Sequence, residues 1–72
     1  RDVVLTNRQA IFQRQSEHER VLVAVNADEN PYTAHFDAGC GRAVDLLTGQ
    51  THDFGGGSEL PPYSVAFWRC EA

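Results

Sequence analysis

The chain has 72 residues and a formal net charge of −4, and its basic residues are all Arg. A domain of this size buries only about 60% of its unfolded surface, so its stability is marginal and a neighbouring domain would support it. The apolar fraction of 42% excludes wholesale disorder, the absence of a basic stripe argues against nucleic acid as a partner, and no apolar run approaches the roughly 18 residues that would cross a membrane.

The chain begins Arg1-Asp2-Val3-Val4, without the apolar region or the cleavage site of a signal peptide. It also lacks an initiator Met, which suggests a fragment of a longer protein. We expect residues 1–72 to form one domain of that protein. The compartment stays open between cytoplasmic and secreted.

Short β-strands are the expected elements, because no segment keeps apolar residues at helical spacing for more than about two turns. Turn residues also interrupt the chain at every ten or so positions. Strands at this spacing predict an all-β fold, a small antiparallel sandwich or barrel. The predicted strands are residues 3–6, 9–15, 20–26, 32–37, 42–47, 51–54 and 63–69.

The run RVLVAVN at 20–26 is apolar at nearly every position, which is typical of a strand buried on both faces. The run at 32–37 alternates instead: Tyr32, Ala34 and Phe36 point to one side and the polar residues to the other. This second strand is therefore expected to be half buried.

Turns are expected at 26–31, where Asn and Asp can bond their own backbone and Pro31 lacks a donor, and at 38–41. Residues 42–47 and 51–54 flank a loop at 48–50. Gly49 in that loop can take the positive φ of a tight hairpin.

The glycine run at 55–57 does not fit a phosphate-binding loop. Such a loop needs glycines at fixed spacing that open a helix, whereas here Pro61 and Pro62 follow closely and Lys is absent. The strand that follows the glycines is too short to fold alone, so an engineered linker is also excluded. We expect a flexible connection between strands.

The last predicted strand places Tyr63, Val65 and Phe67 on one side and Trp68 on the other. We expect the Tyr63 side to enter the core. Trp68 is then a candidate contact residue: it packs on a neighbouring domain, forms a second core layer, or stacks on a sugar. It is the one site residue that the sequence singles out.

Catalytic and metal-binding patterns are missing from the sequence. The acidic pairs sit mostly in polar turns, the three histidines are dispersed, and no serine lies in a nucleophile elbow. We therefore predict no catalytic residue, no metal ligand and no cofactor. The acidic pairs are Glu17 and Glu19, Asp28 and Glu29, and Asp45 and Asp53; the other candidates are His18, His35, His52, Ser58, Ser64 and Cys40.

Cys40 and Cys70 are too few for a disulfide scaffold and lack the CxxC spacing. A bridge between them would stabilise the fold by roughly 3 to 4 kcal/mol on the chain-entropy model. Two unpaired thiols are the preferred reading, with the bridge as the alternative.

Three short motifs, taken in their order along the chain, resemble those of a known protein family. They are an apolar strand that ends in Asn (21–26), the DLLTG hairpin (45–49) and a terminal strand introduced by LPPY (60–63). With this order the chain, over about residues 8–70, resembles the C-terminal β-domain of α-amylase-type enzymes, glycoside hydrolase family 13. Cys40 departs from the plain turn that is usual there.

The resemblance implies an antiparallel Greek-key β-sandwich that follows a catalytic (β/α)₈ barrel. No barrel is present in these residues, so no catalytic residue is carried over. The parent would act on α-glucosidic bonds, as neopullulanase, cyclomaltodextrinase or α-amylase does, and this domain would buttress the barrel. The alternatives are a weak carbohydrate-binding module, with α-glucan as ligand, and an unrelated β-sandwich for protein contacts.

Overall fold

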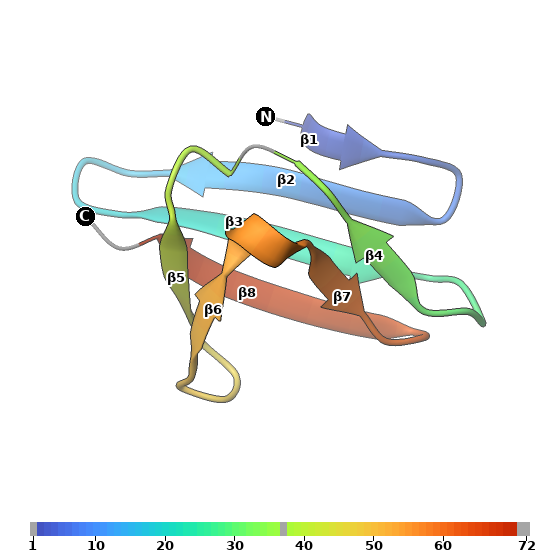
Figure 1. Ribbon diagram of the computed structural model, residues 1–72. Helices are drawn as coiled ribbons and strands as arrows, with labels where there is room; N and C mark the ends of the chain where they lie inside the picture. Colours follow the sequence, from blue (N-terminus) through green and yellow to red (C-terminus); the bar gives the residue numbers. More distant parts are fainter. Residues whose placement is uncertain (1, 37, 71–72) are drawn as a thin grey trace.

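A computed structural model describes residues 2–36 and 38–70 and shows a β-structure with one short 3₁₀ helix (Figure 1). None of its helical structure in these residues has the length and apolarity to span a membrane. The strands are β1 (Asp2–Leu5), β2 (Gln9–Gln15), β3 (Arg20–Asn26), β4 (Tyr32–Ala34), β5 (Arg42–Asp45), β6 (Thr51–Asp53), β7 (Ser58–Leu60) and β8 (Ser64–Cys70), and the 3₁₀ helix η1 is Phe54–Gly56.

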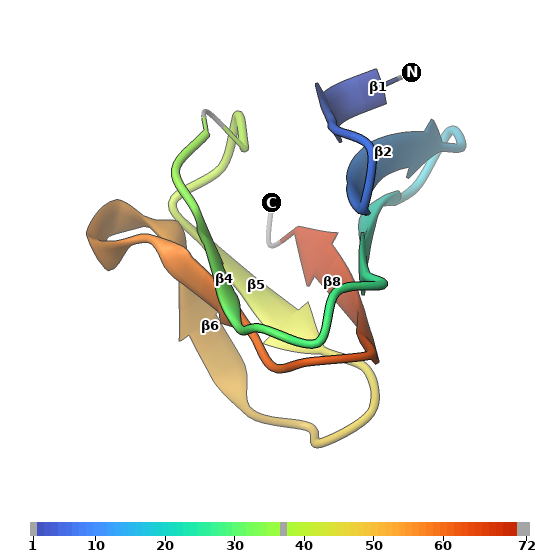
Figure 2. The ribbon, with the colours of Figure 1, turned by 90° about the vertical axis from the view of Figure 1, so that its right-hand side faces the viewer.

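The strands form two antiparallel sheets, one of six strands in the order β1-β2-β3-β8-β5-β6 and one of two strands, β4-β7. The last strand of the chain, β8, inserts between β3 and β5, so neighbours in the large sheet are distant in sequence. In the view of Figure 2, β4 stands across from β2 and β8. The expected all-β, antiparallel Greek-key sandwich is confirmed.

The core lies between the two sheets. Ile11 on β2 and Leu22 on β3 contribute fully buried side chains from the large sheet, and Ala34 and Leu60 contribute from the small one. Each large aliphatic side chain buried in this way stabilises the fold by about 1.5 to 3 kcal/mol. The small sheet therefore serves as the cover of one face of the large sheet.

Asn26, at the end of β3, connects the small sheet to the large one through hydrogen bonds of its side chain. Its side chain is 1% exposed, and its Nδ2 donates to the carbonyl oxygens of Asn30, Leu60 and Pro61 at 3.0, 3.0 and 3.1 Å. Its Oδ1 accepts from Gln9 Nε2 at 3.1 Å and from the Asp28 amide at 3.0 Å. One buried amide thus joins β2, β3, the following loop and the end of β7.

The strand predictions at 9–15 and 20–26 are confirmed to the residue. The strand predicted at 32–37 ends at Ala34, and its last position, 37, lies outside the described residues. The hairpin at β5 and β6 is also confirmed, but its loop begins at Leu46. There Asp45 Oδ1 accepts the amides of Leu47 and Thr48 at 2.9 and 3.2 Å, which closes the turn.

The glycine run connects two strands, as expected, and it does so through the short helix η1 and an additional strand, β7, that the sequence did not predict. Asp53 Oδ1 accepts the Gly55 amide at 2.8 Å and caps η1, and the chain then enters β7, which pairs with β4. Gly57 lies between them with φ +89°, the left-handed region that favours glycine. The sequence pattern missed β7 because this strand is only 3 residues long and contains the exposed Glu59.

The face assignment of β8 was wrong. Tyr63 is 72% exposed and Val65 44%, whereas Trp68 is 3% exposed and packs in the core. Both faces of the strand are apolar, so alternation alone could not decide which one turns inward. The cross-strand partners decide it, because Trp68 lies opposite Leu22, and Ala66 opposite Ala24, on the buried face of β3.

Candidate interdomain surface

Trp68, the predicted contact residue, lies in an aromatic cluster between the sheets. Its ring stacks on His52 with centroids 4.7 Å apart and planes at 6°, and on Phe36 at 6.5 Å and 21°. Phe54 of η1 meets it edge-on at 5.4 Å. Trp68 is therefore a residue of the core between the sheets, and its contact with a neighbouring domain or a sugar stays a prediction.

The surface of the large sheet opposite the core is also rich in apolar residues. We call it the outer face: the alternate residues of β2, β3 and β8 that the core does not use. Strand register aligns them in three rows across the sheet. The rows are Ala10, Val25 and Val65; Phe12, Val23 and Phe67; and Arg14, Val21 and Arg69.

Antiparallel sheets with one face in water normally alternate apolar and polar residues. On the outer face every position of β3 is a valine, and the middle row consists of two phenylalanines around Val23. The expectation that residues 20–26 are buried on both faces is met by Val23, which is 9% exposed, while Val21 and Val25 are half buried. The central strands of this sheet therefore carry apolar side chains on both faces.

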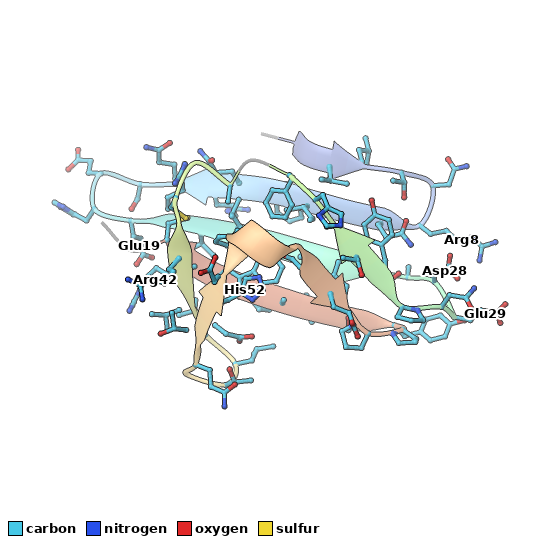
Figure 3. All side chains as sticks on the ribbon, viewed as in Figure 1. Arg8, Glu19, Asp28, Glu29, Arg42 and His52 are labelled. Carbon is cyan, nitrogen blue, oxygen red and sulfur yellow. The ribbon has the colours of Figure 1, made fainter. Side chains whose placement is uncertain are left out.

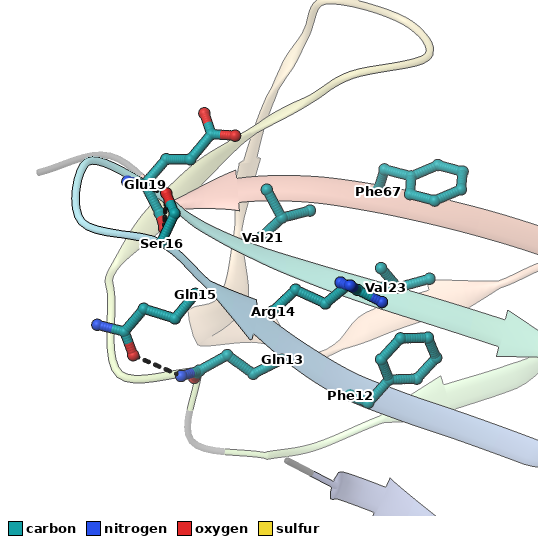
Figure 4. Close-up of a pocket in the computed structure, with 9 residues that line it drawn as sticks. All are labelled: Phe12, Gln13, Arg14, Gln15, Ser16, Glu19, Val21, Val23 and Phe67. Atoms are coloured by element: carbon teal, nitrogen blue, oxygen red, sulfur yellow. Dashed lines mark hydrogen bonds between the residues drawn. The ribbon is translucent and has the colours of Figure 1, made fainter.

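A hollow with a volume of ≈ 710 Å³ opens on one half of the outer face (Figure 4). Figure 4 shows the stem of Arg14 lying along the sheet toward Val23, between Phe12 and Val21. The stem adds apolar cover and its guanidinium stays exposed, as is usual for long basic side chains. The hollow is lined by Phe12, Gln13, Arg14, Gln15, Ser16, Glu19, Val21, Val23 and Phe67.

A second, smaller hollow, of ≈ 260 Å³, lies beside the β5–β6 hairpin. Trp68 and His52 line it together with Asp45 and Glu59. Since Trp68 is 3% exposed, little of its ring is open to this hollow.

The acidic candidates take structural roles or lie in solvent. Asp45 and Asp53 accept backbone amides in turns, and Asp28 Oδ1 accepts the Asn30 amide at 3.1 Å in the loop after β3. Glu17 and Glu19 lie in the exposed β2–β3 turn. The structure thus does not assemble these carboxylates as a facing pair.

The histidines are also separated. His52 Nε2 bonds the buried Ser58 Oγ at 2.8 Å, which joins β6 to β7. His35 lies against Gly57, and His18 lies 3.9 Å from Glu17 with both side chains 91% exposed. Within the described ranges, 2–36 and 38–70, no group of three or more His, Cys, Asp or Glu side chains could hold a metal ion.

Cys40 and Cys70 are both free and half buried, as preferred from the sequence. Burial, followed by the hydrogen bond and charge interaction with Cys70, raises the pKa of the Cys40 thiol to about 11, against the opposing effect of Arg20. The thiols therefore lie close together at one corner of the core, and Cys40 stays protonated at neutral pH.

The outer face could not be identified as a site from the sequence, because its aromatic residues, Phe12 and Phe67, lie on strands far apart in the chain. The signal was present in the valine run of 20–26, which already indicated burial on both faces. What the pattern could not supply is register: Phe12 and Phe67 become neighbours of Val23 only because β2 and β8 flank β3.

Comparison with solved structures finds one larger protein that contains a segment of the same fold. No family model matches the chain, and a search of the curated proteins finds no match. A crystal structure of an AmyP variant in complex with maltotriose is similar, with a TM-score of 0.87 and 24% sequence identity. The match covers 100% of this chain and 16% of the AmyP chain.

The chain therefore has the fold of a segment of AmyP and spans about a sixth of that protein's length. This agrees with the fold that the resemblance to amylase-type enzymes implied. At 24% identity the likeness establishes fold, and activity is argued separately below.

Proposed function

We propose that residues 1–72 form a non-catalytic accessory domain of a larger glycoside hydrolase of the α-amylase type, and that they pack against its catalytic (β/α)₈ barrel. The observation that carries the proposal is the match to AmyP: it takes in all of this chain but 16% of the other. The AmyP structure contains maltotriose, a short α-glucan, so an α-glucan is the proposed substrate of the parent.

The side chains support a structural role. The carboxylates of Asp45 and Asp53 accept backbone amides in turns. His52 and Ser58 form a hydrogen bond with one another, and Trp68 packs in the core. A domain that is apolar on a second face and marginal in size gains stability from a larger neighbour. Buttressing the barrel is the function that uses these features.

Activity of two polypeptides tests this proposal: the 72-residue chain and the full-length polypeptide that contains it. The full-length polypeptide is expected to release reducing sugar from starch or maltotriose, and the 72-residue chain to release none. Deleting residues 1–72 is expected to shorten the half-life of the activity on heating. A 72-residue chain that cleaves starch alone, or a full-length polypeptide inactive on α-glucans, would contradict the proposal.

Weak α-glucan binding is the second candidate, and the small hollow beside Trp68 favours it. His52, Asp45 and Glu59 supply polar groups there. Because the chain has a single Trp, titration with maltotriose would report directly through Trp68 fluorescence. A saturable change at millimolar sugar supports binding, and an unchanged signal removes this candidate.

A further inference from the structure

We propose that the outer face is the surface by which this domain docks on the larger domain of its own polypeptide, and that the docking surface is apolar at its centre with carboxylates opposite Arg14 and Arg69. The inference rests on the proposed function and deepens it, because it names the face and the chemistry of its partner.

The first step is that the opposite face is already occupied. Leu22, Ala24 and Trp68 point to the small sheet and are 0 to 3% exposed. β4, β7 and η1 cover them through Ala34, Leu60 and Phe54. A larger neighbour therefore finds no apolar surface on the core side of the central strands.

The second step is that the outer face is continuous across three strands, as the pairing shows. Register sets Phe12, Val23 and Phe67 in one row, with Val25 and Val65 in the next. Val65 is 44% exposed, and the hollow exposes the flank of the phenylalanine row. The remaining residues of these two rows are half buried except Val23, which is 9% exposed, and a contiguous apolar surface that is partly exposed in this way is typical of an interaction site.

The third step concerns charge. The chain carries a net charge of −4, yet Arg14 and Arg69 lie on either side of Val21 in the same row. Glu19, in the β2–β3 turn, is the acidic side chain that borders the hollow. The arginine end of the face is thus locally basic, and a guanidinium that docking removes from water needs a carboxylate partner.

This charge pattern disfavours a second copy as the occupant. In a two-fold contact the same surface meets itself. The arginine row of one copy would then face either the arginine row of the other or its Ala10, Val25 and Val65 row. The first contact sets like charges together and the second buries guanidinium groups on apolar residues, and both are unfavourable.

The larger domain is the occupant that the comparison supports. This fold makes up 16% of the AmyP chain, so most of that polypeptide lies outside the matched segment. A separate larger domain can offer carboxylates opposite Arg14 and Arg69, which the outer face itself does not offer. The required partner surface is a cluster of apolar side chains with Asp or Glu on one side.

Photo-crosslinking in the full-length polypeptide tests the docking surface. The photoreactive residue p-benzoylphenylalanine replaces Phe12 or Phe67 in two separate samples, and Leu47, which is 63% exposed in the β5–β6 loop, in a control. We expect positions 12 and 67 to crosslink within one polypeptide to peptides outside residues 1–72, and the control to give none of these products. Crosslinks between two copies of the outer face, or none at 12 and 67, would overturn the inference.

Charge reversal tests the partner chemistry. Arg14→Glu with Arg69→Glu should lower the crosslinking yield at position 67 by tenfold or more, whereas Arg8→Glu, in the exposed β1–β2 turn (Figure 3), should leave it unchanged. The unfolding midpoint of the 72-residue chain with both reversals is the folding control and should stay at its native value. An unchanged yield would refute the requirement for carboxylates.

The two proposals fail in different ways. Crosslinks from the outer face to a domain without α-glucan activity would uphold the docking surface and reject the proposed enzyme. Activity on starch without crosslinks at positions 12 and 67 would uphold the enzyme and reject the docking surface.

Discussion

At Gly57 both the backbone conformation and the neighbouring side chains oppose any residue larger than glycine. With φ at +89°, a Cβ atom would lie 2.7 Å from His35 Cε1 and 3.1 Å from Thr33 Cγ2. The approach arises because Gly57 leads into β7, which pairs with the strand that contains Thr33. The sequence shows three consecutive glycines, but only the pairing of β7 with β4 identifies which one is required.

Gly57→Ala should therefore destabilise the chain by about 1 to 3 kcal/mol. Gly56→Ala is the matched control, since a Cβ there meets no atom within 4 Å, and its effect should stay within about 0.5 kcal/mol. Urea unfolding followed by Trp68 fluorescence measures both. Equal losses for the two variants would mean that the close approach to His35 carries no cost.

Cys40 gives the chain a pH dependence on the alkaline side. Burial raises the pKa of its thiol from 9.0 to about 11, helped by Cys70 and opposed by Arg20. The folded state holds the proton more tightly than the unfolded state, so the stability that this thiol contributes is complete below about pH 9 and is lost as the pH rises to about 11. The urea midpoint of the native chain should fall across this window.

Cys40→Ala isolates that effect from the tyrosines, which titrate in the same range. The variant should show a smaller fall of the urea midpoint between pH 9 and 11 than the native chain. Alkylation of native Cys40 by iodoacetamide at pH 9 should also be slower than that of an unfolded control. Parallel pH curves for the native chain and the variant would show that Cys40 is not the group responsible.

Strands with a long run of β-compatible residues could be predicted from the sequence. The face that a strand buries could not be predicted where it depends on the neighbouring strands. β2 and β3 were predicted to the residue, because each has seven residues rich in β-compatible side chains. β8 was predicted as a strand but with its faces exchanged, because both of its faces are apolar. The outer face and the true position of Trp68 therefore emerged only with the strand register.

The two-stranded sheet shows that very short strands are also difficult to predict from the sequence. β4 and β7 have three residues each, too few for periodicity to identify the second of them. Their place is set by long-range bonds, above all those from Asn26 to the carbonyls of Leu60 and Pro61. The asparagine that ends the apolar run was visible in the sequence, but its partners were not.

Asn26→Asp tests this attachment. The carboxylate would replace a donor by an acceptor against the carbonyls of Asn30, Leu60 and Pro61, and a buried polar group without its bond costs about 1 to 3 kcal/mol, more when charged. We expect a loss of about 3 kcal/mol or more in urea unfolding. Asn7→Asp, at an exposed position in the β1–β2 turn, is the control, and a loss as large there would show that added charge alone is responsible.

At the scale of the whole molecule, one sheet carries two apolar faces. The small sheet covers the first, through Ala34 and Leu60. The second has Phe12, Val23 and Phe67 in one row, and we propose that a neighbouring domain covers it. This division accounts for a chain that folds as a sandwich yet keeps a second apolar surface.

Amide hydrogen exchange tests the central claim most directly. Peptides from β3 and β8 would be compared between the 72-residue chain and the full-length polypeptide, with the loop at 46–50 as the internal control. Docking stabilises the central strands, so exchange in 20–26 and 64–70 should slow by tenfold or more in the full-length polypeptide while the control loop is unchanged. Equal exchange of these strands in both polypeptides would contradict the claim that a larger domain covers the outer face.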